Sequence, residues 1–241
     1  MAKPWRGNLV HTKTGYCSEP RPVAPGTSSL LVLIVVVAAL VLAGPPVTLA
    51  QESAQQALST PAPSLWAGEV GEGFTRGAHE LELSSGAGAG MAIFGTRQYH
   101  DWVLGAVDYG WVLTDVVGNG HWYCGNWELM ADVFGGFQFH PNHAYLFGAA
   151  PLLRYDFATG TRLVPFVNIG AGVSGTDIRN GDLSTSFEFN LQFGAGVHWF
   201  LCDHAALTAQ YRMMHLSNAG MESPNLGVNN STLLVGVAWW F

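Results

Sequence analysis

The stretch that decides the fold is Ser186–Phe200, SFEFNLQFGAGVHWF. Its side chains alternate strictly between apolar and polar or small types. One face would carry Phe187, Phe189, Leu191, Phe193, Ala195, Val197 and Trp199, and the other Glu188, Asn190, Gln192, Gly194, Gly196 and His198. A period of two residues is typical of a β-strand, because successive side chains of a strand point to opposite faces of the sheet. The stretch therefore predicts a strand with one large, continuous apolar face.

The same pattern recurs along the chain from residue 79 onward, and each copy is followed by Gly, Asn, Asp or Pro residues that favour turns. It predicts eight strands, at about 79–93, 98–113, 122–139, 143–157, 162–174, 186–200, 204–216 and 231–241. An even number of regularly spaced antiparallel strands indicates an all-β fold that closes into a barrel.

Composition decides between a soluble and a membrane barrel. Charged residues make up only 11% of the chain, against roughly 25% in soluble domains. The polar face is too sparse for a solvated surface, and aromatic residues gather near strand ends, as in the interfacial girdles of membrane barrels. The sequence thus predicts an eight-stranded antiparallel transmembrane β-barrel of the bacterial outer membrane. A soluble, lipocalin-like barrel is the alternative.

The two ends of the chain support export. An apolar run of fifteen residues, 30–44, follows basic residues and precedes the small residues up to Ala50, which is the pattern of a secretory signal peptide. A membrane anchor is the alternative, although a spanning helix needs about 20 residues. We expect residues 1–50 to be cleaved, 51–76 to be a flexible lead-in and 77–241 to form the barrel. The last predicted strand ends on the aromatic residue Phe241, and the closing strands of outer-membrane barrels commonly end on an aromatic residue.

Charge and cysteine content narrow the function. After residue 50 the chain has six arginines, no lysine and sixteen acidic residues, which argues against a nucleic-acid surface. No His or Cys cluster has metal-ligand spacing, so neither a metal nor another cofactor is expected. An exported protein can form a disulfide, but two distant cysteines, Cys124 and Cys202, do not settle whether they pair.

The interior of an eight-stranded barrel has room only for side chains. The inward positions include Glu80, Glu82, Asp108, Glu128, Asp132, Asp156, Glu188, Arg154, Arg162 and Arg212. Isolated charges in such a space are costly, so we expect a paired and hydrogen-bonded plug rather than a diffusion pore.

The motif HLSNAG, residues 215–220, places an imidazole and a hydroxyl two residues apart at the end of the seventh predicted strand. His215 and Ser217 continue the odd-numbered series that faces outward on this strand. Two residues on the same strand face can serve as a general base and its nucleophile, whereas the ordinary alternative is a polar pair at the rim.

Together with PNLGVNN, residues 224–230, this motif resembles the signature of the outer-membrane lipid A 3-O-deacylases, the barrel-type relatives of acyloxyacyl hydrolases. The resemblance implies a serine esterase that removes an ester-linked acyl chain from lipid A of lipopolysaccharide in the outer leaflet. It assigns the base to His215, the nucleophile to Ser217 and the orienting acid to position 229. The motif covers about fifteen residues, and the eight-strand plan extends the likeness over the mature chain.

Position 229 departs from the family pattern, since the family's Glu is Asn229 here. Replacing the acid of a Ser-His-acid triad by an amide can cost ~10⁴ in rate, because the amide can hold the wrong imidazole tautomer. Glu222, in the same connection, is a candidate substitute acid. On this view a glutamate restored at position 229 is expected to raise the rate. The oxyanion candidates are the groups of Asn218, Gly220 and Asn225, whose ordinary role would be to form the turn.

Two functions remain open at this stage: a lipid A esterase, and a catalytically silent barrel with a structural or surface-binding role. The sequence does not identify the acyl chain or the oligomeric state.

Overall fold

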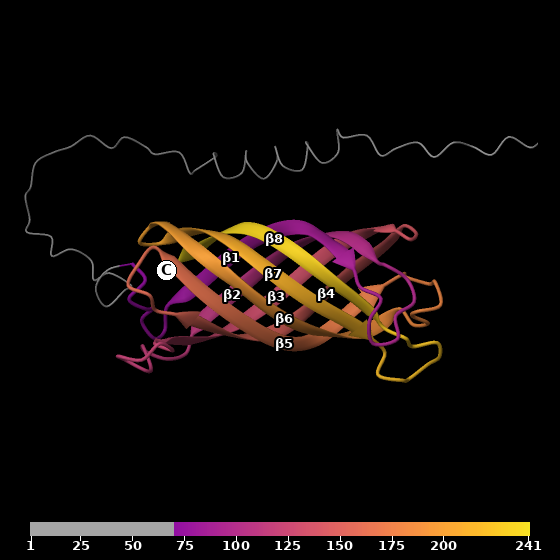
Figure 1. Ribbon diagram of the computed structural model, residues 1–241, viewed down its shortest axis with the longest axis horizontal. Helices are drawn as coiled ribbons and strands as arrows, with labels where there is room; N and C mark the ends of the chain where they lie inside the picture. The colour runs from indigo at the N-terminus through magenta and orange to yellow at the C-terminus, as the bar shows by residue number, and fades with distance from the viewer. Residues whose placement is uncertain (1–69) are drawn as a thin grey trace, which may run out of the picture. The chain divides into compact units, whose positions relative to one another are not determined.

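The structure, a computed structural model, describes residues 70–241, which form an eight-stranded antiparallel β-barrel (Figure 1). The strands are β1 (His79–Gly90), β2 (Asp101–Val112), β3 (Gly125–His140), β4 (Ala144–Phe157), β5 (Leu163–Thr176), β6 (Phe187–Cys202), β7 (Ala205–Ser217) and β8 (Val228–Trp240). Each strand pairs with its neighbour in sequence, and β1 pairs with β8 to close the barrel. The predicted fold class and all eight strands are confirmed.

Two expectations concern residues before position 70. The signal peptide over 1–50 and its alternative, an anchor at 30–44, lie outside the described residues. Within residues 70–241 the structure has no helix that is long and apolar enough to cross a membrane.

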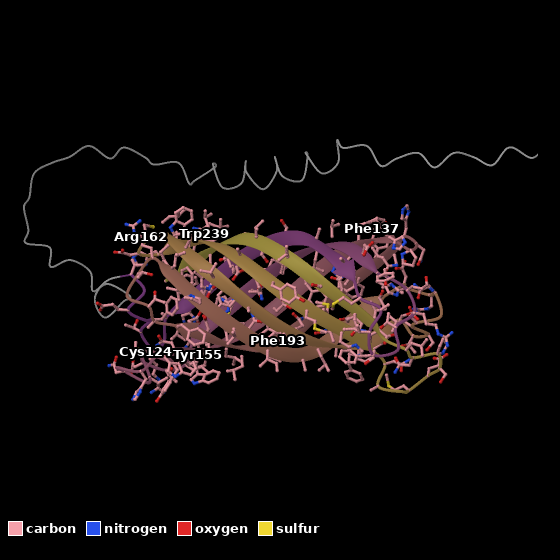
Figure 2. All side chains as sticks on the ribbon, viewed as in Figure 1. Cys124, Phe137, Tyr155, Arg162, Phe193 and Trp239 are labelled. Atoms are coloured by element: carbon pink, nitrogen blue, oxygen red, sulfur yellow. The ribbon has the colours of Figure 1, made fainter. Side chains whose placement is uncertain are left out.

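The outer wall of the barrel is apolar, as the alternation predicts. Phe193, at mid-height on β6, points outward, and it is about half exposed (Figure 2). Trp239 and Tyr155 lie toward the end that holds the C-terminus, and Phe137 lies toward the other end. Aromatic residues near both ends of an apolar wall are the arrangement of a membrane-spanning barrel.

The two ends of the barrel differ. The end that we call the loop end carries the connections 91–100, 141–143, 177–186 and 218–227, and the end that we call the terminal end holds residues 70–78 and Phe241. At the terminal end Phe74 is buried and stacks on Trp240 with ring centroids 5.3 Å apart. Of the lead-in expected over 51–76, residues 51–69 lie outside the described residues, and Phe74 in the remaining part packs inside this end of the barrel.

Apolar side chains fill both ends of the interior. One buried cluster contains Trp102, Phe134 and Leu216 toward the loop end, and another contains Phe74 and Phe200 at the terminal end. Charged and polar side chains occupy the layer between them. Because both clusters are packed, this layer is shielded from water at either end.

Two arginines neutralise part of that inner layer. The Arg154 guanidinium lies 3.0 Å from both carboxylate oxygens of Glu80 and 3.0 Å from Glu82 Oε2. Arg212 lies 3.0 Å from Asp132 Oδ1 and 3.7 Å from an oxygen of Asp108. All of these side chains are almost fully buried. The predicted pairing is therefore confirmed for these four carboxylates, whereas Glu128 and Asp156, which are also buried, form no ion pair with an arginine of residues 70–241.

One arginine lies outside the interior predicted for it, and the two cysteines do not pair. Arg162, expected inside, is exposed just before β5 and donates to the Leu201 carbonyl at 3.2 Å, because the strand begins one residue later than predicted. Cys124 and Cys202, whose pairing was left open, are both free.

The plug predicts a specific stability difference. Arg154→Met should lower the free energy of unfolding by about 3–5 kcal/mol, because it leaves two buried carboxylates without their cation. The exposed Arg162→Met is the matched control, with an expected change of about 0.5 kcal/mol or less. Urea unfolding of the refolded barrel, followed by tryptophan fluorescence, measures both. Equal midpoints for the two variants would contradict the paired-plug description.

Candidate active site

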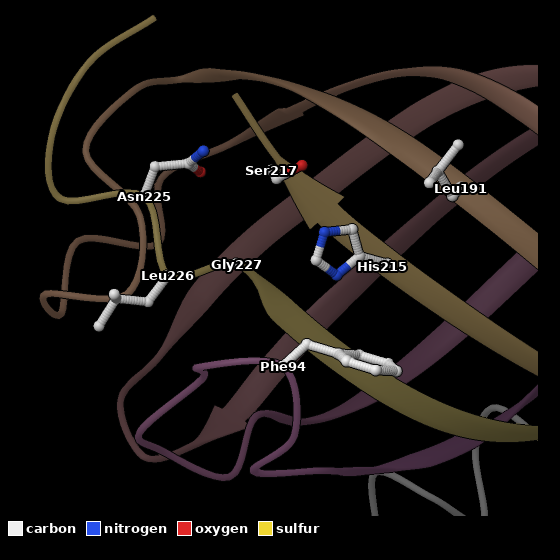
Figure 3. Close-up of a pocket in the computed structure, with 7 residues that line it drawn as sticks. All are labelled: Phe94, Leu191, His215, Ser217, Asn225, Leu226 and Gly227. Atoms are coloured by element: carbon white, nitrogen blue, oxygen red, sulfur yellow. The ribbon is translucent and has the colours of Figure 1, made fainter. Parts of the chain in front are cut away.

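A pocket opens on the outer wall at the loop end, where β7 ends. His215 and Ser217 line it together with Phe94, Leu191, Asn225, Leu226 and Gly227 (Figure 3). The pocket encloses about 420 Å³. Leu191 of β6 lies opposite His215 in the strand register and is exposed on the outer wall. The structure thus places the imidazole and the hydroxyl on the outer face, where the alternation along β7 predicts them.

His215 is held from the neighbouring strand. Asn229 is its register partner in β8, and His215 Nδ1 lies 2.7 Å from Asn229 Oδ1. The sequence predicts that the eighth strand begins at residue 231, so position 229 was not expected to lie on a strand. In the structure β8 begins at Val228, which brings Asn229 beside His215.

The amide of Asn229 is oriented by its other contacts. Its nitrogen lies 2.9 Å from the Ile93 carbonyl oxygen, which can only accept a hydrogen bond. The amide oxygen therefore faces His215, and His215 Nδ1 must carry the hydrogen that this oxygen accepts. Because a neutral imidazole carries one hydrogen, Nε2 is left as the acceptor. In Figure 3 one ring nitrogen of His215 is turned toward Ser217.

Ser217 shares the pocket with His215, two residues further along β7. The structure records no direct hydrogen bond between these two described side chains. Catalytic hydrogen bonds are often long before substrate binds and shorten in the complex, so the missing bond does not by itself exclude a base and its nucleophile.

The connection 218–227 contains the three residues considered as oxyanion donors. The Asn218 backbone N–H donates to Asn225 Oδ1 at 3.0 Å, and the Gly220 N–H donates to Asn218 Oδ1 at 2.9 Å. The Asn218 side-chain nitrogen donates to the Glu222 carbonyl at 2.9 Å. These donors are engaged within the loop. The Asn225 side chain also lines the pocket, and since its oxygen accepts from Asn218, its NH₂ group remains the donor that can act there.

Glu222 does not lie beside His215. It is exposed on the connection, it contributes its backbone carbonyl to Asn218, and no carboxylate of residues 70–241 forms an ion pair with His215. The orienting group next to the imidazole is therefore the Asn229 amide.

Sequence reasoning missed a buried residue that joins three loops. The Asp182 carboxylate accepts from the Gln98 N–H at 3.0 Å and lies 3.1 Å from His100 Nε2. Its backbone carbonyl accepts from the Leu226 N–H at 2.9 Å. Asp182 thereby ties the connection 177–186 to the two loops that surround the pocket. A single aspartate inside an irregular loop carries no periodic signal by which it could be found.

One grouping of side chains in the described part of the chain has metal-ligand proximity, namely Glu80, Glu82 and His198 in the barrel interior. Arg154 already lies among them, with Nη1 3.3 Å from His198 Nε2. The guanidinium thus supplies the positive charge there, and the grouping is remote from the pocket at the loop end.

Comparison with known proteins identifies relatives. A sequence model of the family described as Lipid A 3-O-deacylase (PagL) matches residues 105–238, more than half of the chain. Lipid A deacylase PagL of Pseudomonas aeruginosa is 33% identical over 119 residues, which are 47% of this chain and 61% of that protein. The aligned region therefore spans less than two thirds of this relative.

Solved structures include other barrels. Neisserial surface protein A is 16% identical and has a TM-score of 0.50, with 69% of this chain and all of that chain covered. The outer membrane enzyme PagL is 21% identical and has a TM-score of 0.48, with 65% of this chain and 97% of that chain covered. At such identities the first of these likenesses supports the barrel fold alone.

Two glycines in the same connection give a prediction about the pocket. A Cβ at Gly227 would lie 2.6 Å from the His215 ring, whereas a Cβ at Gly220 would meet nothing within 4 Å. Both have a positive φ, 78° and 80°, so both alanine variants carry similar backbone strain. We expect Gly227→Ala to displace the imidazole and to lower labelling of Ser217 by a fluorophosphonate at least tenfold, since the hydroxyl loses its base.

Gly220→Ala is the matched control and should be labelled nearly as fast as the parent. Loss of labelling in both variants would mean that backbone strain in the connection, rather than contact with His215, controls the reactivity of Ser217.

Proposed function

The chain belongs to the lipid A 3-O-deacylase (PagL) family, and we propose that it is an outer-membrane serine esterase that removes an ester-linked acyl chain from lipid A. The observation that carries the proposal is the position of His215 and Ser217. They line a pocket on the apolar outer wall, at the loop end of the barrel. A catalytic pair in that position meets lipid rather than a soluble substrate.

The expected orientation in the membrane follows from the barrel. The apolar wall with aromatic residues at both ends matches the hydrocarbon layer of a bilayer. Longer loops of outer-membrane barrels lie outside the cell and short turns lie in the periplasm. With the loop end outward, the pocket lies at the outer leaflet, where lipopolysaccharide places the acyl chains of lipid A. Lipid A and the surrounding lipid are therefore the proposed partners.

The chemistry is acyl transfer to serine followed by hydrolysis. Ser217 Oγ attacks the ester carbonyl while His215 Nε2 takes its proton, and a tetrahedral intermediate forms. When this intermediate collapses, the C–O bond to the sugar hydroxyl breaks and the imidazolium returns the proton to that oxygen. Water then attacks the acyl-serine with the same base, which releases the fatty acid and restores Ser217.

The Asn225 side-chain NH₂ is the proposed donor to the oxyanion. A donor that is fixed before the reaction stabilises the negative charge without reorganising, and removing one such donor typically costs 10²–10³ in kcat. The hydrogen bond from Asn218 to Asn225 Oδ1 holds the amide in place. Asn218 and Gly220 then shape the connection and do not themselves donate to the substrate.

Asn229 performs one of the two tasks of a triad acid. It orients the imidazole through the 2.7 Å contact at Nδ1, but as a neutral group it adds no charge to stabilise the imidazolium. The missing charge favours the second candidate function, a catalytically silent barrel with a structural or surface-binding role. Activity of the parent protein on lipid A distinguishes the two.

Removal of the nucleophile tests the activity. Ser217→Ala should abolish loss of an ester-linked acyl chain from lipid A, and the barrel should still fold because the residue lies at a strand end. Ser231→Ala is the matched control, since Ser231 lies on the outer face of the adjacent strand but opposite Met213. Mass spectrometry of lipid A from cells that express each protein is the measurement. If lipid A is equally intact in cells that express the parent, Ser217→Ala and Ser231→Ala, the esterase function is refuted and the catalytically silent barrel is the function that remains.

A second pair of variants tests the oxyanion donor and the substitute acid. Asn225→Asp keeps the acceptor for the Asn218 N–H but removes the NH₂ donor, so kcat should fall by about 10²–10³. Glu222→Gln should leave kcat unchanged, because the Glu222 carboxylate does not pair with His215. Kinetics on purified lipid A in detergent measure both. A large loss with Glu222→Gln and none with Asn225→Asp would reverse the two assignments.

A further inference from the structure

The outer-wall pocket is bordered by a tight turn, Ile93–Thr96, in the connection between β1 and β2. The Thr96 N–H donates to the Ile93 carbonyl at 3.1 Å, and both central residues have positive φ, 54° at Phe94 and 103° at Gly95. These angles are those of a type I′ turn, which favours Asn, Asp or Gly at its first central position. Phenylalanine there is unfavourable, and such conformations persist where the surroundings hold them.

The turn is held by Asn229. The Asn229 side-chain nitrogen donates hydrogen bonds to two groups of the turn, the Ile93 carbonyl at 2.9 Å and the Thr96 hydroxyl at 2.6 Å. The Thr96 hydroxyl gives its own hydrogen to the Gly227 carbonyl at 2.9 Å, so it presents a lone pair to the amide. The Met91 N–H also donates to the Asn229 backbone carbonyl at 2.8 Å. Asn229 is fully buried under the turn, although it lies on the outer face of β8.

We propose that the turn Ile93–Thr96 is a receptor for an amide at position 229, and that it makes this site a Ser-His-Asn triad. Thr96 is a positioning residue that acts through Asn229 on His215. The proposal rests on the esterase function proposed above and deepens it. An amide in place of a triad acid is damaging when its NH₂ group turns to the imidazole and fixes the wrong tautomer. Here that rotation would set the amide oxygen against the Ile93 carbonyl oxygen.

The receptor is selective for an amide over a carboxylate. Both hydrogens of the Asn229 NH₂ group have an acceptor, and the Ile93 carbonyl cannot become a donor. An aspartate at 229 would have the same shape, but its second oxygen would lie against that carbonyl. The turn and the amide are thus matched to each other. We therefore expect the opposite of the expectation from sequence, in which a glutamate at 229 raises the rate.

Thr96 variants test the positioning role. Thr96→Val keeps the shape and removes the hydroxyl, so kcat on lipid A should fall about tenfold or more while KM changes little. Thr96→Ser keeps the hydroxyl and should recover most of the rate. Thr208→Val, which removes a buried hydroxyl from the interior side of β7, should leave kcat at the parent value. Equal kcat for Thr96→Val and the parent would overturn the role of Thr96.

Asn229→Asp tests the selectivity. We expect kcat below that of the parent, with a ratio that falls further as pH rises, because the ionised carboxylate repels the Ile93 carbonyl while the protonated acid can still donate to it. A rate above that of the parent at neutral pH would show that the turn accommodates a carboxylate and would overturn the proposal.

A measurement without catalysis separates this proposal from the proposed function. In ¹⁵N-histidine-labelled protein in detergent micelles, nitrogen chemical shifts report the tautomer of His215, assigned with His215→Gln. We expect the Nδ1–H form in the parent and a mixture of tautomers in Thr96→Val. An unchanged tautomer in Thr96→Val would overturn the positioning role. The parent protein could leave lipid A intact and still hold His215 in the Nδ1–H form, with that form lost in Thr96→Val. This result would refute the esterase function but would support the amide receptor.

Discussion

Closure of eight strands is the constraint on which the rest of the molecule depends. Every strand is paired on both sides, so no strand edge is left to face hydrocarbon. Closure also fixes the side of the barrel on which each side chain lies, because the period along a strand is two. Acidic and basic residues within the strands, such as Glu80 and Arg154, are enclosed in the interior, and apolar residues form the wall. The same parity carries His215 and Ser217 to a pocket on the outer wall of the barrel.

The site itself depends on loops that the barrel only brings near each other. β7 supplies the proposed base and nucleophile, β8 supplies Asn229, and the connection 91–100 covers that amide. Asp182 joins this connection to the two others around the pocket. The strands therefore position His215 and Ser217, and the loop contacts orient the Asn229 side-chain amide. That orientation determines whether the imidazole has a free Nε2.

The sequence was most informative where the physics is periodic. Alternation in segments such as 186–200 predicted all eight strands and the outward face of His215. It failed at strand ends: β8 begins at Val228, and Arg162 lies outside the barrel, because pairing and turn geometry rather than hydrophobicity set those limits. Thr96, Ile93 and Asp182 lie in loops, where contacts between distant segments leave no local pattern. Hence the sequence showed that position 229 departs from the family, but not that the Asn229 amide contacts Ile93 and Thr96 in a distant turn.

We propose that a triad completed by an amide hydrolyses an ester of lipid A on the outer wall of the barrel. The most direct test is to incubate the purified, refolded protein with lipid A in detergent and to follow both lipid and free fatty acid by mass spectrometry. We expect loss of one ester-linked acyl chain, with an equal amount of free fatty acid and with the amide-linked chains retained. Intact lipid A after prolonged incubation with a folded barrel would contradict it.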